Sequence, residues 1–120
     1  MSKRPVFLFI TIIFVVSIHA QENKSLQEKF LEAEYFFMNE DYPDAITFYM
    51  QLYEKLPDNS NLAHRIGVCY LNIPGKKNLS VDYLETASRD MSAKHKDGTI
   101  SQVAAPYDAL YDLALSLIHI

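Results

Sequence analysis

The stretch LAHRIGVCYLN, residues 62–72, decides the fold. Its apolar residues recur at helical spacing, yet Gly67 stands in the middle, where glycine costs about 1 kcal/mol relative to alanine. A helix tolerates this where a second helix must come close, because packed helix axes lie about 8–10 Å apart and a side chain at the crossing would separate them. Tyr70, almost one turn later, is placed to cover the gap beside the crossing. The stretch therefore predicts a helix that meets a partner helix at Gly67.

Further segments on both sides of this stretch have helical spacing, and none alternates with period two as a strand would. We expect helices over residues 25–39, 44–56, 62–73, 80–91 and 106–120. The breaks NEDYP, PDNSN and PGKKN contain proline, glycine or capping residues, which commonly end or begin helices. Residues 92–105 are polar and contain Gly98, so we expect a loose loop there. The sequence predicts an all-α fold.

The expected helices also repeat. When the chain is shifted on itself by 34 residues, Ala33 and Phe36 fall on Gly67 and Tyr70. The helix after the first of these pairs contains Ala45 and Tyr49, and Pro57 follows its end. Small and aromatic residues at these spacings resemble the tetratricopeptide repeat (TPR) family. The resemblance implies antiparallel helix hairpins that form a short right-handed solenoid.

The resemblance also implies a domain organisation. Repeat 1 covers about 24–58, repeat 2 about 59–91, a loop about 92–105, and an incomplete repeat 3 about 106–120. Lys29 and Glu32 depart from the pattern, because the family prefers large apolar residues at those positions. Leu84 is expected on the partner helix facing Gly67, and the crossings in the neighbouring hairpins are expected at Ala33 and Ala114.

The first twenty residues have the order of a secretory signal peptide. Lys3 and Arg4 precede an apolar run, VFLFITIIFVVSI, and small Ala20 follows it. The alternative is a retained anchor, but thirteen helical residues span about 20 Å, less than the roughly 30 Å hydrocarbon core. Cleavage leaves residues 21–120 and changes the net charge from −4 to −6, since Lys3 and Arg4 leave. An acidic exported domain is poorly suited to nucleic acid, whose phosphates require clustered Lys and Arg.

The sequence predicts no catalytic residue, no cofactor-binding site and no metal site. The four histidines lack helical metal-ligand spacing, and none of the three glycines belongs to a phosphate-binding loop. Cys69 is the single cysteine, so it can form no intrachain disulfide and is expected to be a buried small apolar residue. Asp108 and Asp112 lie one turn apart and could hold a cation weakly, although exposed acidic surface is the simpler interpretation.

Stacked repeats form a concave surface lined by the first helix of each hairpin. By repeat position, the residues expected to line it and bind a partner are Glu34, Asn61, His64, Arg65, Asn72, Asp108, Tyr111 and Asp112. Arg65 is the best candidate anchor, because a guanidinium can hold a carboxylate with two hydrogen bonds. The alternative is that these residues are only the solvated side of the helices.

A narrower resemblance concerns the export signal, YLNIPGKKNLSVDYLETA and AAPYDALYDLA. Together they resemble the N-terminal TPR segment of Bacteroidetes-type envelope proteins, in which TPRs precede a WD40-like propeller and an OmpA-like domain. The resemblance implies a non-catalytic periplasmic, outer-membrane-associated scaffold that binds a protein or peptide and forms the front of a longer protein. An open alternative is the docking arm of an exported enzyme whose catalytic domain follows Ile120. The tail LSLIHI resembles translated sequencing-adapter DNA, and we place no inference on residues 118–120.

Overall fold

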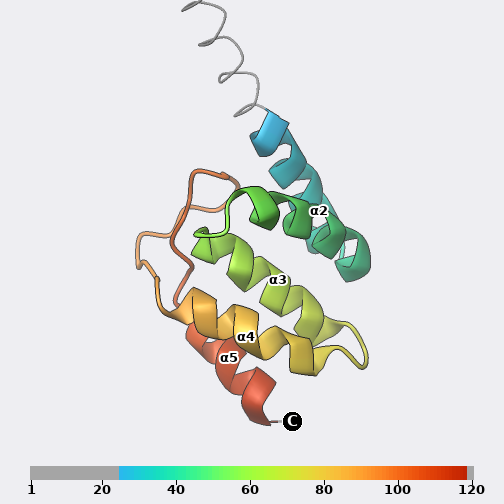
Figure 1. The fold of residues 1–120 in the computed structure, drawn as a ribbon, viewed down its shortest axis with the longest axis vertical. Helices are drawn as coiled ribbons and strands as arrows, with labels where there is room; N and C mark the ends of the chain where they lie inside the picture. The colour runs from blue at the N-terminus through green and yellow to red at the C-terminus, as the bar shows by residue number, and fades with distance from the viewer. Residues whose placement is uncertain (1–24, 119–120) are drawn as a thin grey trace, which may run out of the picture.

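The computed structural model describes residues 25–118, and the expected signal peptide lies outside the described residues. Residues 25–38 are helical, and four helices follow: α2 (Tyr42–Lys55), α3 (Ser60–Asn72), α4 (Lys77–Ser88) and α5 (Asp108–Ile118) (Figure 1). No strand occurs within residues 25–118, where an isolated bridge pairs Met91 with Ala105. The predicted all-α fold class is confirmed.

Local chemistry explains where the helices begin. The side-chain oxygen of Asn59 accepts a hydrogen bond from the Leu62 backbone N–H at 3.0 Å, so α3 begins at Ser60, two residues before the expected start. Pro43 lies in the first turn of α2, where its missing N–H costs nothing. Helix α5 begins at Asp108 rather than Pro106, because the Pro106 carbonyl accepts from the Ala109 N–H in a tighter turn.

Helix α3 packs most extensively against α4, and Gly67 lies at their contact. A β-carbon built on Gly67 would lie 2.5 Å from Cγ of Leu84. Tyr70 lies beside this contact, with its ring centroid 5.8 Å from that of Tyr83. The prediction that Gly67 admits a partner helix at Leu84 is confirmed.

The crossings expected at two alanines have different outcomes. Ala33 is fully buried in the core. Ala114 is exposed, because α5 packs against α4 and α3 through its other side. The expected close crossing at Ala114 is therefore absent from the described part of the chain.

The core has two parts. The larger cluster joins residues 25–38, α2 and α3 and consists of Phe30, Ala33, Ala45, Tyr49, Leu52, Leu62, Ile66 and Cys69. The smaller cluster consists of alanines alone: Ala63, Ala87, Ala105 and Ala109. Because alanine is short, this second cluster lets α3, α4 and α5 approach one another closely. Figure 1 shows the resulting succession of neighbouring helices from α2 to α5.

Residues 92–105 contain no helix or strand, but they are not loose. Ala105 is fully buried, and its N–H donates to the Asp90 carbonyl at 2.8 Å. Further along, the Val103 carbonyl accepts from the Asn61 backbone N–H at 2.9 Å. The expectation of a loose loop is wrong, because hydrogen bonds with α3 and with the end of α4 attach this segment to the folded chain.

Candidate functional site

Some of the residues expected to line a binding surface connect helices that are not consecutive in the chain. Arg65 on α3 contacts Glu34 in the helix of residues 25–38. Its neighbour His64 contacts Asp112 on α5. These two contacts join residues 25–38, α3 and α5 into one layer. The structure brings four of the eight expected residues together in two pairs.

The first pair is the centre of a buried polar network. The Arg65 guanidinium donates to both carboxylate oxygens of Glu34, at 2.8 Å through Nε and 3.1 Å through Nη2. The Tyr49 hydroxyl from α2 donates to the same carboxylate at 2.6 Å. The guanidinium also lies 4.4 Å from the centre of the Phe37 ring, a cation–π contact. Arg65, expected to anchor a partner's carboxylate, already holds an internal one.

The electrostatics of this network follow from its burial. Burial alone would lower the pKa of Arg65, but the adjacent Glu34 carboxylate reverses this and raises it. Burial also raises the pKa of the Tyr49 hydroxyl, and its carboxylate neighbour raises it further. Both groups therefore keep their protons at neutral pH, so the network retains its donors.

The second pair links α3 to α5. Nε2 of His64 lies 2.7 Å from a carboxylate oxygen of Asp112, and His64 is 3% exposed. Within residues 25–118, the other ring nitrogen of His64 has no hydrogen-bond partner. Asp108, one turn before Asp112, is exposed and has no part in this contact. The described residues contain no group of three or more His, Cys, Asp or Glu side chains that could hold a metal ion.

Asn61 is the fifth expected residue that makes an internal contact. It is 2% exposed, and its side-chain oxygen lies 2.8 Å from Nε2 of His95 in segment 92–105. The second ring nitrogen of His95 lies 3.1 Å from the Asp97 carboxylate. Burial lowers the pKa of His95, and the Asp97 carboxylate partly offsets this effect. Asn61 therefore helps to hold segment 92–105 against α3.

The remaining three expected residues, Asn72, Asp108 and Tyr111, are exposed. The Asn72 side chain donates to the Val68 carbonyl one turn earlier at 2.8 Å, whereas the Tyr111 side chain lies outside the core at 66% exposure. The expected binding residues thus divide into an internally bonded group, buried or partly buried, and a small exposed group.

Gln27 is a contact residue that the sequence pattern does not predict. Its side-chain amide donates to the Gly98 carbonyl at 3.1 Å and accepts from the Ile100 N–H at 2.8 Å. Asn59 adds a longer hydrogen bond, at 3.4 Å, from its side chain to the Ile100 carbonyl. No periodic pattern pairs residue 27 with a segment about seventy residues later, so sequence spacing carries no signal for this contact.

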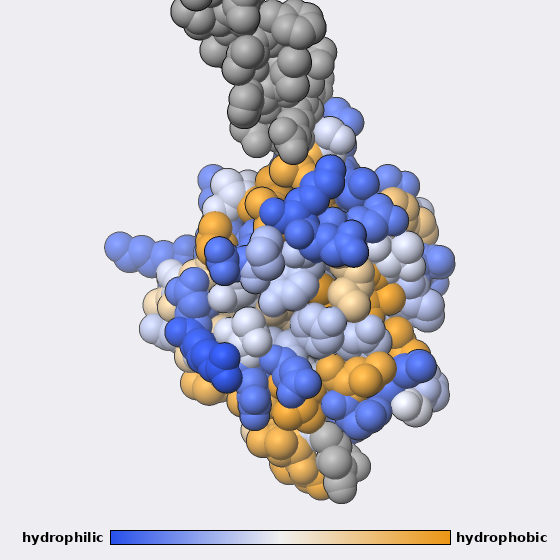
Figure 2. Space-filling model, viewed as in Figure 1, coloured by the Kyte–Doolittle hydropathy of each residue, from blue (hydrophilic) through white to orange (hydrophobic). Residues whose placement is uncertain are grey.

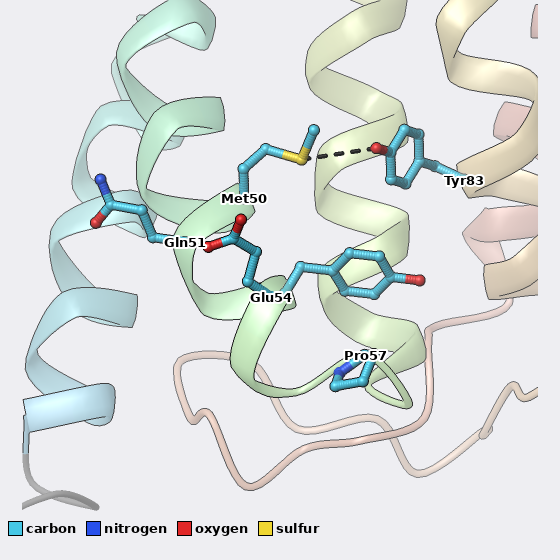
Figure 3. A pocket seen from close by; sticks show the side chains of 6 residues that line it. Met50, Gln51, Glu54, Pro57 and Tyr83 are labelled. Carbon is cyan, nitrogen blue, oxygen red and sulfur yellow. Dashed lines mark hydrogen bonds between the residues drawn. The ribbon is translucent and has the colours of Figure 1, made fainter.

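Helices α2 and α4 line a separate pocket of about 430 Å³. Its lining residues are Met50, Gln51, Tyr53, Glu54, Pro57 and Tyr83. Figure 3 shows Tyr83 directed from α4 toward Met50 on α2, and its hydroxyl donates to the sulfur at 3.7 Å. The polar groups Gln51 and Glu54 lie at the α2 side of the pocket.

Hydrophobic side chains gather at the α5 end of the molecule, as Figure 2 shows. The exposed ones on and just before α5 are Tyr107, Leu110, Tyr111, Leu117 and Ile118. Within residues 25–118, no helix combines the length and the apolar character needed to cross a membrane.

Comparisons with protein-family models, with curated proteins and with solved structures find no match to this chain.

Proposed function

We propose that this chain is a TPR-type scaffold that binds a protein or peptide and has no catalytic role of its own. The observation that carries the proposal is the pair of contacts Glu34–Arg65 and His64–Asp112, which join alternate helices into one layer. Stacked helix hairpins produce such a layer, and helical-repeat proteins use it as an extended binding surface.

Two packing features support the repeat interpretation. Gly67 and Leu84 allow the close approach of α3 and α4 within one hairpin. The alanine cluster between α3, α4 and α5 allows the next helix to stack on that hairpin. A right-handed solenoid is the arrangement that we propose for these units.

The exposed residues of the layer are the most accessible place for a first contact with a partner. Asp108 and Tyr111 precede the paired Asp112 within one turn of α5. A tyrosine ring with a hydrogen-bonding hydroxyl is a common anchor in protein interfaces. The partly buried contact of Asp112 with His64 links α5 to α3, so the exposed side chains lie on a helix that is attached to its neighbour.

Site-specific photocrosslinking tests this proposal. A photoreactive residue at Tyr111 or Asp108, in the full protein expressed in its native host, should give the same defined protein adduct. The same residue at Glu85, which is exposed on α4 in the other layer, is the matched control. Equal capture from Glu85, or no capture from α5, would count against the proposal.

We further propose that the protein acts in the bacterial periplasm, associated with the outer membrane, as the front part of a longer protein. The sequence of the first twenty residues and the resemblance to envelope TPR segments support this location. Mass spectrometry of the protein from cells should find a mature N-terminus at Gln21. A retained Met1 would instead indicate an anchored or unexported chain.

A further inference from the structure

Segment 97–103 lies in a seat built by the N-terminal parts of two helices in the same layer. Gln27 contacts the backbone of Gly98 and Ile100 with both ends of its amide, and Asn61 donates its N–H to the Val103 carbonyl. These contacts recognise main chain, so they do not depend on the side chains of the seated segment. A different peptide backbone could make the same hydrogen bonds.

Two side chains of the segment add specific contacts. The Asp97 carboxylate lies 3.7 Å from the Arg65 guanidinium, and three residues later Ile100 packs against the main core. An acidic residue followed, three positions on, by a branched aliphatic residue thus makes both side-chain contacts with the seat.

The segment occupies its seat incompletely. Ile100 borders two pockets, one of about 260 Å³ shared with Leu56 and Val103, and one of about 390 Å³ shared with Leu26 and Leu56. Asp97 is 77% exposed, and its contact to Arg65 is longer than a hydrogen bond. By comparison, Arg65 holds Glu34 at 2.8 Å and 3.1 Å. A ligand with a better-placed carboxylate and a larger aliphatic side chain would fit the same seat more closely.

We propose that Gln27, Asn59, Asn61 and Arg65 form a peptide-binding seat which residues 97–103 occupy in the resting chain. The partner is a non-helical peptide with a carboxylate three residues before a branched aliphatic side chain, and it displaces the internal segment. This inference rests on the proposed function and names the class of ligand. The tethered segment competes with the external peptide at an effective concentration that can reach the millimolar range. The external peptide therefore binds more weakly than it would to an empty seat, and its binding depends on release of the internal segment.

A labelled synthetic peptide with the sequence of residues 95–105, HKDGTISQVAA, is the probe. Fluorescence anisotropy measures its binding to the full chain and to the double variant Asp97→Ala/Ile100→Ser, which weakens the internal segment. We expect at least about tenfold tighter binding to the double variant, because the competing segment is removed. Adding Gln27→Ala to the double variant should abolish the gain, and Lys94→Ala, at an exposed residue outside the seat, should leave the native affinity unchanged.

A peptide in which the residues matching Asp97 and Ile100 are replaced by Asn and Ser should not bind. If the double variant is folded by circular dichroism and binds both peptides equally, the seat has no peptide specificity and the proposal is wrong. A double variant that fails to fold also overturns it, because the segment would then be a structural brace that cannot leave. A defined crosslink from Tyr111 combined with no peptide binding would overturn this inference alone and leave the proposed function standing.

Discussion

Leu84 fills the space that a side chain at Gly67 would need: a β-carbon there would lie 2.5 Å from Leu84 Cγ and 2.6 Å from its Cδ2. A methyl group added at Gly67 overpacks the core, which usually costs about 1–3 kcal/mol, and we expect Gly67→Ala to be destabilising on balance. The gain in helix propensity, about 1 kcal/mol, offsets part of that cost. Urea unfolding followed by circular dichroism measures the difference.

The double variant Gly67→Ala/Leu84→Ala is the control for this explanation. With the Leu84 side chain removed, the added methyl group has room, so Gly67→Ala should become neutral or stabilising in that background. Additive effects of the two substitutions would contradict the prediction, because residues in direct contact are expected to couple.

The buried pair of Glu34 and Arg65 gives a second prediction. Arg65→Met leaves the Glu34 carboxylate buried without its cation, and we expect a loss of about 3–5 kcal/mol in the free energy of unfolding. Adding Glu34→Gln removes the orphaned charge and should recover part of the loss. Arg89→Met, at an exposed arginine on the other layer, is the matched control and should change stability by less than about 0.5 kcal/mol. Equal effects at both arginines would show that the Glu34 contact contributes nothing.

The sequence predicted the helices and the helix crossing because these depend on local spacing. Gly67 is informative by itself, since a glycine inside an apolar helix is costly unless a neighbouring helix needs the space. The pairing of Glu34 with Arg65 was missed, because the two residues are 31 positions apart and each is typical of a solvated helix surface when considered singly. Both side chains are covered because residues 25–38 and α3 lie side by side.

The contacts that hold segment 97–103 could not be predicted from the sequence for a related reason. Gly98 and the surrounding polar residues are typical of a mobile loop, and the contacts that attach the segment involve its backbone. Any residue offers the same backbone hydrogen-bonding groups, so the residue types of segment 97–103 do not identify it as the partner of Gln27. Ala114 lies on an exposed side of α5 in the described residues, so the crossing expected there stays a prediction.

The link between α3 and α5 gives a third prediction. Asp112→Ala removes the hydrogen-bond partner of His64 Nε2, and the other ring nitrogen of His64 already lacks one within the described residues. We expect a loss of about 1–3 kcal/mol, the cost of leaving a buried polar group unsatisfied. Asp112→Asn, which can still accept a hydrogen bond, should lose less. Hydrogen exchange should show faster exchange across α5 in the alanine variant, and unchanged exchange would argue against a role of this pair in docking α5.

Alkaline pH gives a fourth prediction. Burial raises the pKa of the Cys69 thiol from 9.0 to about 12, so the unfolded chain ionises first as pH rises. The contribution of this thiol to stability is therefore complete below pH 9 and declines above it. Between pH 8 and 10, in a reducing buffer, the free energy of unfolding should fall by about 1 kcal/mol more in the native protein than in Cys69→Ala. The other ionisable groups are the same in both proteins, so the difference isolates Cys69; parallel pH profiles would contradict its burial.

The apolar surface of α5 predicts concentration-dependent self-association. Leu110 and Leu117 are 52% and 55% exposed, and contiguous exposed apolar patches on soluble proteins commonly mark contact sites. Association that favours the folded chain raises the melting temperature with protein concentration. Sedimentation velocity and thermal melts across a hundredfold range of concentration measure both effects. We expect Leu110→Glu/Leu117→Glu to abolish the concentration dependence, since burying either carboxylate in an apolar contact is costly.

Leu31→Glu, at a leucine of similar exposure (49%) on a different helix, is the matched control and should leave association intact. A monomer at every concentration, or equal loss of association in the Leu31 variant, would show that the α5 surface is not the contact.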